Sequence, residues 1–433
     1  MTRKSKVFAA VMAAFMAQGA FAETTFNGYL RSGSGSNGEG GKEACFQLNN
    51  TFGFGGRVAS AGRLGAECDT YGEFALGADM GESNGTKFKI NTLLAFGAQQ
   101  NQDYEQSVPA FREAYAVAEG VGTGMLASAN IWAGKRYYKR ADVHIVDLFT
   151  LEVTGPGAGI ENVDLGFGKF SYALMRAGQG DYAQLELASG GGDDQELGRV
   201  TRIGNAGKQM SNHDLRLEGV NLGAIGSLSV GANIISNNSA DGVDKTKGHS
   251  LWATHSINLM KGVQNSVTIQ TAKDSGSLNG AGLWWSGANV KGHKAWRVID
   301  SVNFDFGDIN GAVFAGIANE KFPWNEGKTW SFVARPVYHF SENYSVALEA
   351  GTTRTKPKGG DSTHINKLTI APQLSLGKSF WARPALRAYY TYASWSDKGD
   401  ASAKTGRDNL VTVPGYADKK SGSSYGVQME AWW

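Results

Sequence analysis

Charged and aromatic side chains are concentrated in one stretch of the chain, residues 131–168 (IWAGKRYYKRADVHIVDLFTLEVTGPGAGIENVDLGFG). Guanidinium and carboxylate groups form strong hydrogen bonds with polar ligands, and aromatic rings offer flat stacking surfaces. A long connection is usually either functional or disordered, and the β-branched and aromatic residues of this one argue against disorder. We therefore expect a folded loop that selects a ligand. Its charged and aromatic residues between Gly134 and Gly157 are Lys135, Arg136, Tyr137, Tyr138, Lys139, Arg140, Asp142, His144, Asp147, Phe149 and Glu152.

Residues 1–22 have the pattern of a secretory signal peptide. They contain a basic start, a short apolar core (VFAAVMAAFMA) and a small-x-small cleavage site, Ala20-Phe21-Ala22, before Glu23. The apolar core is too short to span a membrane, which takes about 20 apolar residues. The sequence therefore predicts an exported mature chain, residues 23–433. We expect this chain to form one domain, because no boundary in composition divides it.

The composition of the chain points to many short strands. Glycine supplies 59 of 433 residues, about twice the usual share of roughly 7%. The aromatic residues are 11 Trp, 15 Tyr and 21 Phe, whereas proline occurs only eight times. The whole chain has 42 basic and 40 acidic residues. Because the predicted leader contains three of the basic ones, the mature chain is nearly neutral and has no basic surplus for nucleic-acid binding.

Apolar and polar residues alternate with a period of two in segments separated by turn-rich stretches, and no helical periodicity accompanies them. A soluble sandwich would also alternate, but a sandwich of this length would normally split into domains. Short connections alternate with long ones, as in outer-membrane barrels. We therefore predict an all-β fold, an 18-stranded antiparallel transmembrane β-barrel with lipid outside and water inside. The predicted strands start near residues 24, 68, 86, 111, 126, 160, 169, 213, 226, 249, 264, 294, 311, 329, 343, 366, 382 and 422.

Four aromatic residues fall on the polar face of the predicted strands. They lie beside Arg31, Glu73, Arg383 and Glu430, where a girdle or space-filling role is the simpler alternative. Aromatic rings can stack on the apolar faces of a sugar while charged groups bind its hydroxyl rim. The pattern therefore predicts weak, guiding contacts with carbohydrate in a pore. The four residues are Tyr29, Tyr71, Trp381 and Trp432.

Two further features bear on chemistry. Cys45 and Cys68 predict one disulfide in an exported chain, since a metal site would need more Cys or His ligands nearby. His144 lies between Asp142 and Asp147 and could be read as a catalytic base, but such clusters are more often satisfied loop networks. We expect no enzyme, no metal and no cofactor.

The chain resembles the maltoporin family, the trimeric sugar-specific porins of Gram-negative outer membranes. The resemblance runs from the first predicted strand to the last residue and is weakest in 179–212 and 274–330. It rests on eight motifs, FNGYLRSG (26–33), RLGAECDTYGE (63–73), PAFREA (109–114), IWAGKRYY (131–138), DVHIVD (142–147), GPGAGIENVDLGFGK (155–169), SFWARPALR (379–387) and QMEAWW (428–433).

The resemblance implies a homotrimeric barrel whose third loop folds inward as a constriction beside an aromatic track. Tyr104 matches an aromatic position donated across the trimer interface, and Cys45 and Cys68 match a disulfide of the first loop. Val263 stands where the family has a phenylalanine near the periplasmic exit. The aromatic track would comprise Tyr29, Tyr71, Trp381 and Trp432. The polar track and constriction would comprise Arg31, Arg63, Glu73, Arg112, Arg140, Asp142, His144, Asp147, Phe149 and Glu152.

The family also implies a substrate and a mode of transport. Malto-oligosaccharides would cross by passive diffusion, without a cofactor. Phe149 departs from the tyrosine of the maltodextrin porins, and Thr150 and Leu151 replace further aromatics, whereas Arg140 is retained. A porin of the same fold for sucrose or a β-glucoside, or a general diffusion porin, remains the alternative, and the outer loops could serve as a receptor. The implied partners are outer-membrane lipid and lipopolysaccharide, a second and third copy of the chain, and a periplasmic sugar-binding protein.

Overall fold

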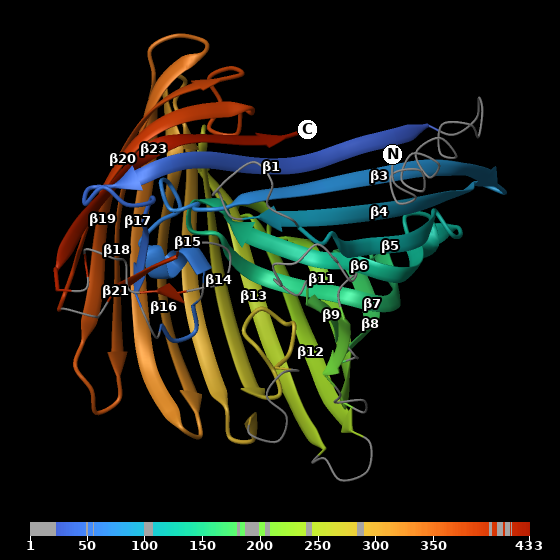
Figure 1. Ribbon diagram of the computed structural model, residues 1–433. Helices are drawn as coiled ribbons and strands as arrows, with labels where there is room; N and C mark the ends of the chain where they lie inside the picture. The colour runs from blue at the N-terminus through green and yellow to red at the C-terminus, as the bar shows by residue number, and fades with distance from the viewer. Residues whose placement is uncertain are drawn as a thin grey trace.

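The computed structural model describes residues 23–48, 51–54, 56–98, 107–179, 182–186, 199–203, 208–239, 245–283, 290–397, 401–404, 410–411, 416 and 418–433. The predicted signal peptide, residues 1–22, and Tyr104 lie outside the described residues. Within these ranges, eighteen antiparallel strands form one sheet that closes on itself as a barrel (Figure 1). The last strand pairs with the first, with Tyr29 opposite Trp432 and Arg31 opposite Glu430.

The barrel strands follow one another around the wall in chain order. They are β1 (Thr24–Asn37), β3 (Thr70–Ser83), β4 (Thr86–Ala98), β5 (Ala110–Glu119), β6 (Asn130–Val143), β7 (Leu148–Asp164), β8 (Lys169–Gln179), β11 (Lys208–Asn221), β12 (Ser227–Ser239), β13 (Thr246–Met260), β14 (Val263–Asp274), β15 (Lys294–Asp305), β16 (Ile309–Phe322), β17 (Asn325–His339), β18 (Tyr344–Pro357), β19 (Thr363–Ser375), β20 (Ala385–Trp395) and β23 (Ser421–Trp432).

Shorter elements lie in the connections. β2 (Cys45–Leu48) pairs with β21 (Ala401–Lys404), which pairs with β22 (Leu410–Val411), and β9 (Tyr182–Glu186) pairs with β10 (Arg199–Ile203). Four 3-10 turns are described, η1 (Gly56–Ser60), η2 (Gly124–Leu126), η3 (His144–Val146) and η4 (Gly223–Ile225). Among the described residues, no helix is both long and apolar enough to cross a membrane.

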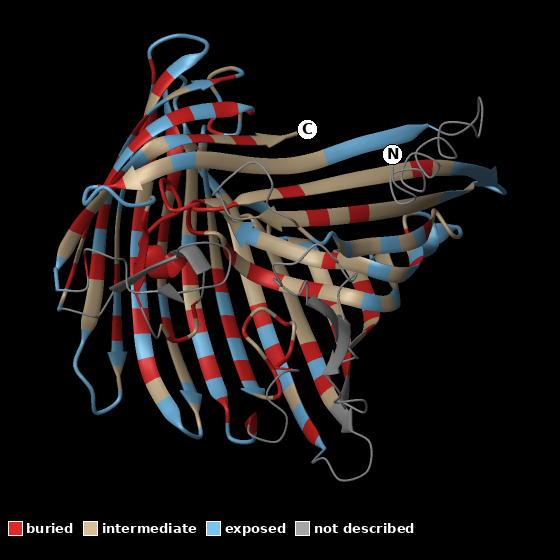
Figure 2. Ribbon diagram, viewed as in Figure 1, coloured by how far each residue is buried: buried red, intermediate tan, exposed pale blue. Residues whose placement is uncertain are grey.

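Buried and exposed residues alternate along many of the barrel strands (Figure 2). On β20, Leu386 and Tyr390 are exposed, whereas Arg387 and Tyr389 are buried. On β23, Val427 is exposed and Glu430 is buried. Because a charged side chain is buried here while its apolar neighbours are exposed, the interior is the polar side of the wall. The alternation predicted from the sequence is thereby confirmed, as is the number of barrel strands.

One predicted boundary was wrong. The strand expected to start near residue 160 is β7, which begins at Leu148. Residues 135–157 therefore form most of a two-stranded hairpin, β6–η3–β7, with only a short turn at its tip. Val143, Leu151 and Val153 favour extended backbone, which allows the wall strands to continue through a charged sequence. The hairpin bends at two register shifts, between Arg136 and Lys139 and between Ala141 and Asp142.

Two connections line the inner wall of the barrel. In the first, η1 contacts β18 and β19, and its Val58 is fully buried. In the second, residues 275–283 follow β14, and Leu278 is only 7% exposed. The described part of this connection is therefore packed inside the barrel. Gly280 and Gly282 have positive φ, and side chains there would collide with Asn233 and Met210 of the wall, which explains the glycines of this segment.

Candidate functional site

The hairpin β6–β7 begins as part of the wall and ends against the opposite strands. Gly134 has φ 130°, and a Cβ there would approach the Ala114 carbonyl oxygen to 2.3 Å, so this position requires glycine. The tip, η3, contacts β16 and β17. Its Ile145 and Val146 are fully buried in one cluster with inward-facing side chains of those strands. Apolar packing therefore fixes the tip. The polar residues of β6 and β7 are not needed for this packing.

The four aromatic residues predicted for the polar face lie in one row. Tyr71 and Tyr29 have ring centroids 6.2 Å apart, and those of Trp381 and Trp432 are 6.4 Å apart. Tyr29 faces Trp432 directly across the β1–β23 pair, which joins the two halves of the row. The structure thus brings Tyr71, Tyr29, Trp432 and Trp381 together in this order along the inner wall.

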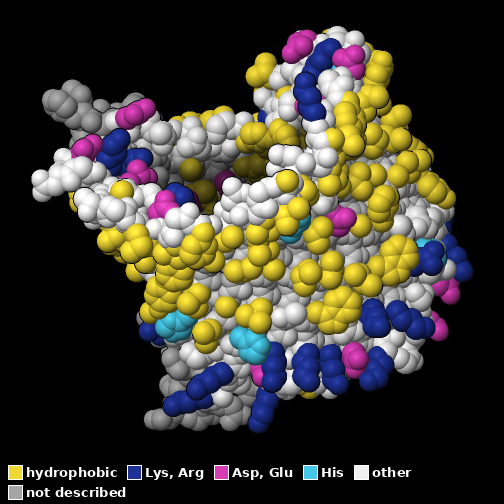
Figure 3. Space-filling view, turned by 180° about the vertical axis from the view of Figure 1, so that it is seen from behind, with side chains coloured by type: hydrophobic (Ala, Val, Ile, Leu, Met, Phe, Trp, Pro, Cys, Tyr) yellow, Lys and Arg dark blue, Asp and Glu magenta, His cyan; other side chains and the backbone are white. Residues whose placement is uncertain are grey.

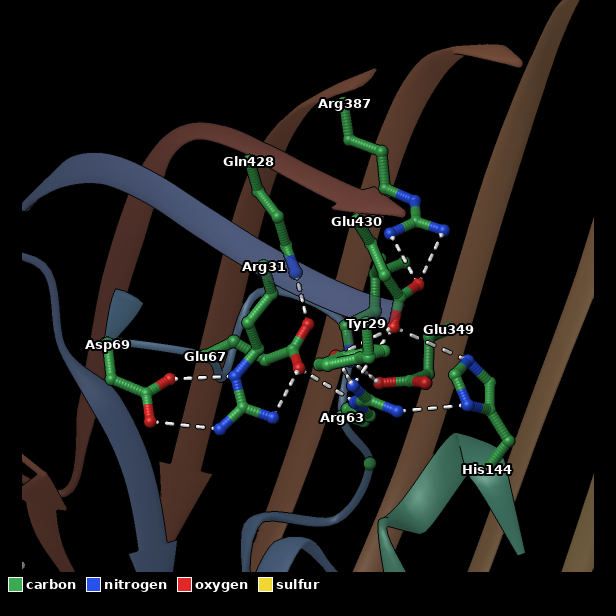
Figure 4. A network of polar contacts seen from close by, with 12 residues as sticks. Tyr29, Arg31, Arg63, Glu67, Asp69, His144, Glu349, Arg387, Gln428 and Glu430 are labelled. Carbon is green, nitrogen blue, oxygen red and sulfur yellow. Dashed lines mark hydrogen bonds and ion pairs between the residues drawn. The ribbon is translucent and has the colours of Figure 1, made fainter. Parts of the chain in front are cut away.

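Arginines lie against these rings. Buried carboxylates hold Arg31 and Arg63 close to Tyr29 (Figure 4). Arg31 lies 5.1 Å from the Tyr71 ring centroid and forms two hydrogen bonds of 2.9 Å with Asp69. Arg383 lies 3.9 Å from the Trp432 ring centroid. Burial lowers the pKa of Arg383 to about 10, so its guanidinium stays charged at neutral pH. Each arginine therefore shows one face to a ring and turns its donors toward an anion.

Arg63 connects the first loop, the row and the hairpin. Its guanidinium pairs with Glu67 at 2.7 Å and with Glu430 at 2.9 Å, and it donates to the Tyr29 hydroxyl. Its backbone N–H donates to the Ile145 carbonyl of the hairpin tip at 2.9 Å. Burial opposes the charge of Arg63, but Glu67 and Glu430 outweigh it and raise its pKa above the ordinary value. Arg63 is thus a permanent cation in the centre of the network.

Glu430 balances several of these cations. It accepts from Arg63, from Arg383 at 2.8 Å and from Arg387 at 3.2 Å, and also from the Tyr29 hydroxyl at 3.2 Å. The side chain is 1% exposed. A buried carboxylate with this many charge-assisted partners holds its neighbours in fixed positions. The sequence signal was present, because Glu430 lies in the QMEAWW motif beside Trp432, yet it was not named as a site residue.

His144 completes the network at the tip of the hairpin. Its Nδ1 lies 2.9 Å from Arg63 Nη1, and its Nε2 lies 3.8 Å from Glu430 Oε1. Its Nε2 also lies 3.4 Å from Arg383 Nη2, so both ring nitrogens face arginine donors. Because arginine can only donate, these contacts favour a neutral ring that accepts over a protonated one. Burial and the nearby arginines lower the pKa of His144. The residue is therefore a satisfied, neutral member of the loop network, with no free base to offer.

A second cluster lies on the hairpin itself. The Arg140 guanidinium is held between two rings, 4.2 Å from the Tyr137 centroid and 4.4 Å from the Phe149 centroid. Glu73 lies 3.6 Å from Arg140 and accepts a 2.6 Å hydrogen bond from the Tyr71 hydroxyl. Glu73 therefore links the stacked arginine to the aromatic row. Tyr137 was missed as a site residue, although the RYYKR run placed an aromatic three positions from Arg140.

The remaining predicted residues lie around this cluster. Glu152 faces Arg140 across the hairpin, and its carboxylate accepts from Asn279 at 3.2 Å. Asp142 faces Phe149 at the end of β6, and Asp147 follows η3 with a positive φ of 48°. Arg112 is the extra residue of a bulge in β5. Val263 pairs with Phe304 and shares the outward face with Ile269, so its side chain is not in the interior row.

One buried pair on the opposite wall holds the hairpin by its backbone. Arg297 donates to the carbonyl oxygens of Phe149 at 3.2 Å, Thr150 at 3.3 Å and Gly53 at 3.1 Å. Gln270 accepts from Arg297 at 2.7 Å and donates to the carbonyls of Thr150 at 2.7 Å and Leu278 at 2.6 Å. This Arg297–Gln270 clasp therefore ties together the first loop, the hairpin and the 275–283 segment. No sequence pattern could have revealed it, since all of the pair's partners are backbone carbonyls.

The first loop is also held covalently. Cys45 and Cys68 form a disulfide, as predicted, with both residues buried. The bridge closes the segment that carries Arg63 and Glu67. Among the described residues, no group of three His, Cys, Asp or Glu side chains is placed to hold a metal ion.

The chain is similar to one protein family and to several solved structures. A family model described as LamB porin matches residues 24–433. Among solved structures, an anion-selective porin from Comamonas acidovorans is similar at 12% identity and a TM-score of 0.45, over 95% of this chain and 100% of that chain. OccAB2 from Acinetobacter baumannii is similar at 10% identity and a TM-score of 0.46, over 95% and 98% of the two chains. OprD from Pseudomonas aeruginosa is similar at 7% identity and a TM-score of 0.44, over 95% of each chain.

The family match covers nearly the whole chain. The strands of this chain close into one barrel with a polar interior. The protein is therefore an outer-membrane porin of a Gram-negative bacterium and not an enzyme, and it belongs to the LamB porin family.

Proposed function

We propose that this porin is selective for malto-oligosaccharides and lets them diffuse passively along the aromatic row. The observation that carries the proposal is the continuous order Tyr71, Tyr29, Trp432, Trp381, with arginines and carboxylates along its edge. Glucose units have two apolar faces and a rim of hydroxyls. Rings can stack on the faces, while charged groups exchange hydrogen bonds with the rim. Many weak contacts in a row allow a sugar both to enter and to leave.

In this proposal the hairpin β6–β7 narrows the lumen beside the row. Arg140 is clamped between Tyr137 and Phe149, so its free donors have a defined direction. Glu152 supplies an acceptor across the same hairpin. A donor and an acceptor facing a stacked sugar would select for the spacing of its hydroxyls. We further propose that the working unit is a homotrimer, which the family resemblance implies.

A porin of the same fold for another sugar is the second candidate. Phe149 favours it, because the ring stacks on Arg140 but has no hydroxyl to offer a sugar. Thr150 and Leu151 also lack the rings that a maltodextrin porin usually has there. The retained Arg140 and the complete row support the first candidate.

Liposome swelling with a panel of sugars tests the proposal. Maltotriose should enter liposomes that contain the porin faster than sucrose or a β-glucoside of similar size. Replacing Tyr71 and Trp432 by alanine should slow maltotriose but leave a small sugar such as arabinose unchanged, since stacking on each ring contributes about 0.5–1.5 kcal/mol. Equal rates for maltotriose and sucrose would reject maltodextrin selectivity, and an unaffected double variant would reject the row.

A further inference from the structure

A band of basic side chains surrounds part of the outer wall at one end of the barrel. We call it the basic rim, and it consists of Lys247, Lys273, Lys294, Lys321, Lys328, Arg354 and Lys356. All seven are exposed on the strands β13 to β18. Figure 3 shows Lys and Arg gathered along the lower edge of the wall, beneath a hydrophobic band.

Strand register places these charges directly beside one another. Lys273 faces Lys294 across β14–β15, and Lys294 faces Lys321 across β15–β16. Lys328 faces Lys356 across β17–β18. Like charges directly opposite on a sheet repel and destabilise the pair. The repulsion between the rim lysines is therefore unfavourable in the isolated protein. A bound anion would neutralise these charges and remove the repulsion.

The described residues supply few anions of their own. Within them, only Lys321 of the rim has a carboxylate at ion-pair distance, Glu326 at 3.7 Å, which also pairs with Lys358 at 3.0 Å. Lys273, Lys294, Lys328 and Lys356 form no ion pair with any residue that the structure describes. The rim is therefore a surplus of positive charge turned away from the lumen.

The position of the rim relative to the membrane follows from the residues next to it on the strands. Trp296 and Trp330 are exposed two positions further along the strands from Lys294 and Lys328. Further from the rim along the strands the outward residues are apolar, for example Ile269 and Phe332. Tryptophan belts mark the boundary between acyl chains and head groups, so the lysines stand at the level of the head groups.

The lengths of the connections show which end of the barrel carries the rim. The rim lies where β14 and β15 are joined by the long connection 275–293, and the opposite end has short turns such as 261–262. Outer-membrane barrels have their longer loops on the outside of the cell. We propose that the basic rim binds the phosphate groups of the phosphorylated glycolipid that forms the outer leaflet. Closely spaced ammonium groups fit two phosphates on a sugar head group, and the tryptophans fit its junction with the acyl chains.

Native mass spectrometry of the folded porin in neutral detergent, with added diphosphoryl lipid A, tests the proposal. The rim variant replaces Lys273, Lys294 and Lys321 by glutamine. The matched control replaces Lys87, Lys169 and Lys261, which are exposed at the opposite, short-turn end of the barrel. Each rim lysine should contribute about fivefold to affinity, so the rim variant should bind lipid A about a hundredfold more weakly. The control should bind within twofold of the wild type.

Three results would overturn the proposal. The rim variant could bind like the wild type, or the control could lose as much affinity as the rim variant. Dephosphorylated lipid A, or phosphatidylglycerol, could bind the wild type as tightly as diphosphoryl lipid A, which would reject the phosphorylated glycolipid as the ligand. If the triple variant does not fold, the single variant Lys294→Glu gives the same comparison. Sugar passage has no part in this assay, so its outcome is independent of the proposed function.

Discussion

Replacing Arg297 by methionine is expected to loosen the hairpin while the barrel stays closed. Methionine fills a similar volume but donates nothing to the carbonyls of Gly53 and Phe149. The Thr150 carbonyl keeps the 2.7 Å hydrogen bond from Gln270. A buried acceptor that loses its donor costs roughly 1–3 kcal/mol, so the loss at Phe149 weakens the packing of the hairpin by roughly 1–3 kcal/mol, and the loss at Gly53 loosens the first loop by a similar amount. The pairing of β15 with β14 and β16 does not involve this side chain.

Single-channel recording in planar bilayers measures the consequence. In the Arg297→Met channel, a less fixed Phe149 should raise the open-channel current noise and weaken block by maltohexaose. Arg297→Lys should be intermediate, because one ammonium group cannot reach three carbonyls as the planar guanidinium does. Arg354→Met is the matched control, since Arg354 is exposed on the outward face of β18 and touches no interior segment.

The folded state of each variant is checked by its heat-dependent mobility in detergent gels, which reports an intact barrel. An Arg297→Met channel with wild-type noise and wild-type maltohexaose block would show that the clasp does not position the hairpin. Equal changes in Arg354→Met would show that the effect is not specific to the clasp.

Three further predictions concern the hairpin and the first loop. Phe149→Tyr should tighten maltohexaose block a few-fold, since a new hydrogen bond contributes about 0.5–1.5 kcal/mol, and an unchanged block constant would show that the ring edge does not meet the sugar. Burial lowers the pKa of His144 in the folded chain. As the pH falls below about 6.5, His144 therefore takes up a proton in the unfolded chain but not in the folded chain, and the folded state loses stability. The melting temperature should therefore fall more between pH 8 and pH 5 in the wild type than in His144→Asn, and parallel curves would contradict this. Replacing Cys45 and Cys68 by serine should make the first loop sensitive to limited proteolysis while the barrel remains folded, because the bridge contributes about 3 kcal/mol of loop closure; an equally resistant loop would show that packing alone holds it.

The barrel itself was predictable because its environment imposes a simple rule. Outward residues such as Leu386 and Val427 meet lipid, and inward ones such as Arg387 and Glu430 meet water or one another. That contrast repeats every second residue, so each strand can be recognised from its own sequence. The aromatic row was predictable for the same reason, because a ring that falls among charges on the inward face departs from the rule.

The interior segments were not predictable from local pattern. The 275–283 segment is rich in serine and glycine, and nothing in such a composition tells whether it lies in solvent or against the wall. The start of β7 at Leu148 was missed because charged residues masked the extended backbone of the hairpin. The clasp could not be predicted from the sequence, since Arg297 and the carbonyl of Phe149 are far apart in the chain and meet only in the folded protein.

Selection of malto-oligosaccharides by the aromatic row and the hairpin can be measured on the wild-type channel. Its most direct test is titration of the wild-type single-channel current with maltohexaose and, separately, with sucrose. Maltohexaose should give saturable block at concentrations at which sucrose leaves the current unchanged. Equal block by the two sugars, or no block by maltohexaose, would contradict it.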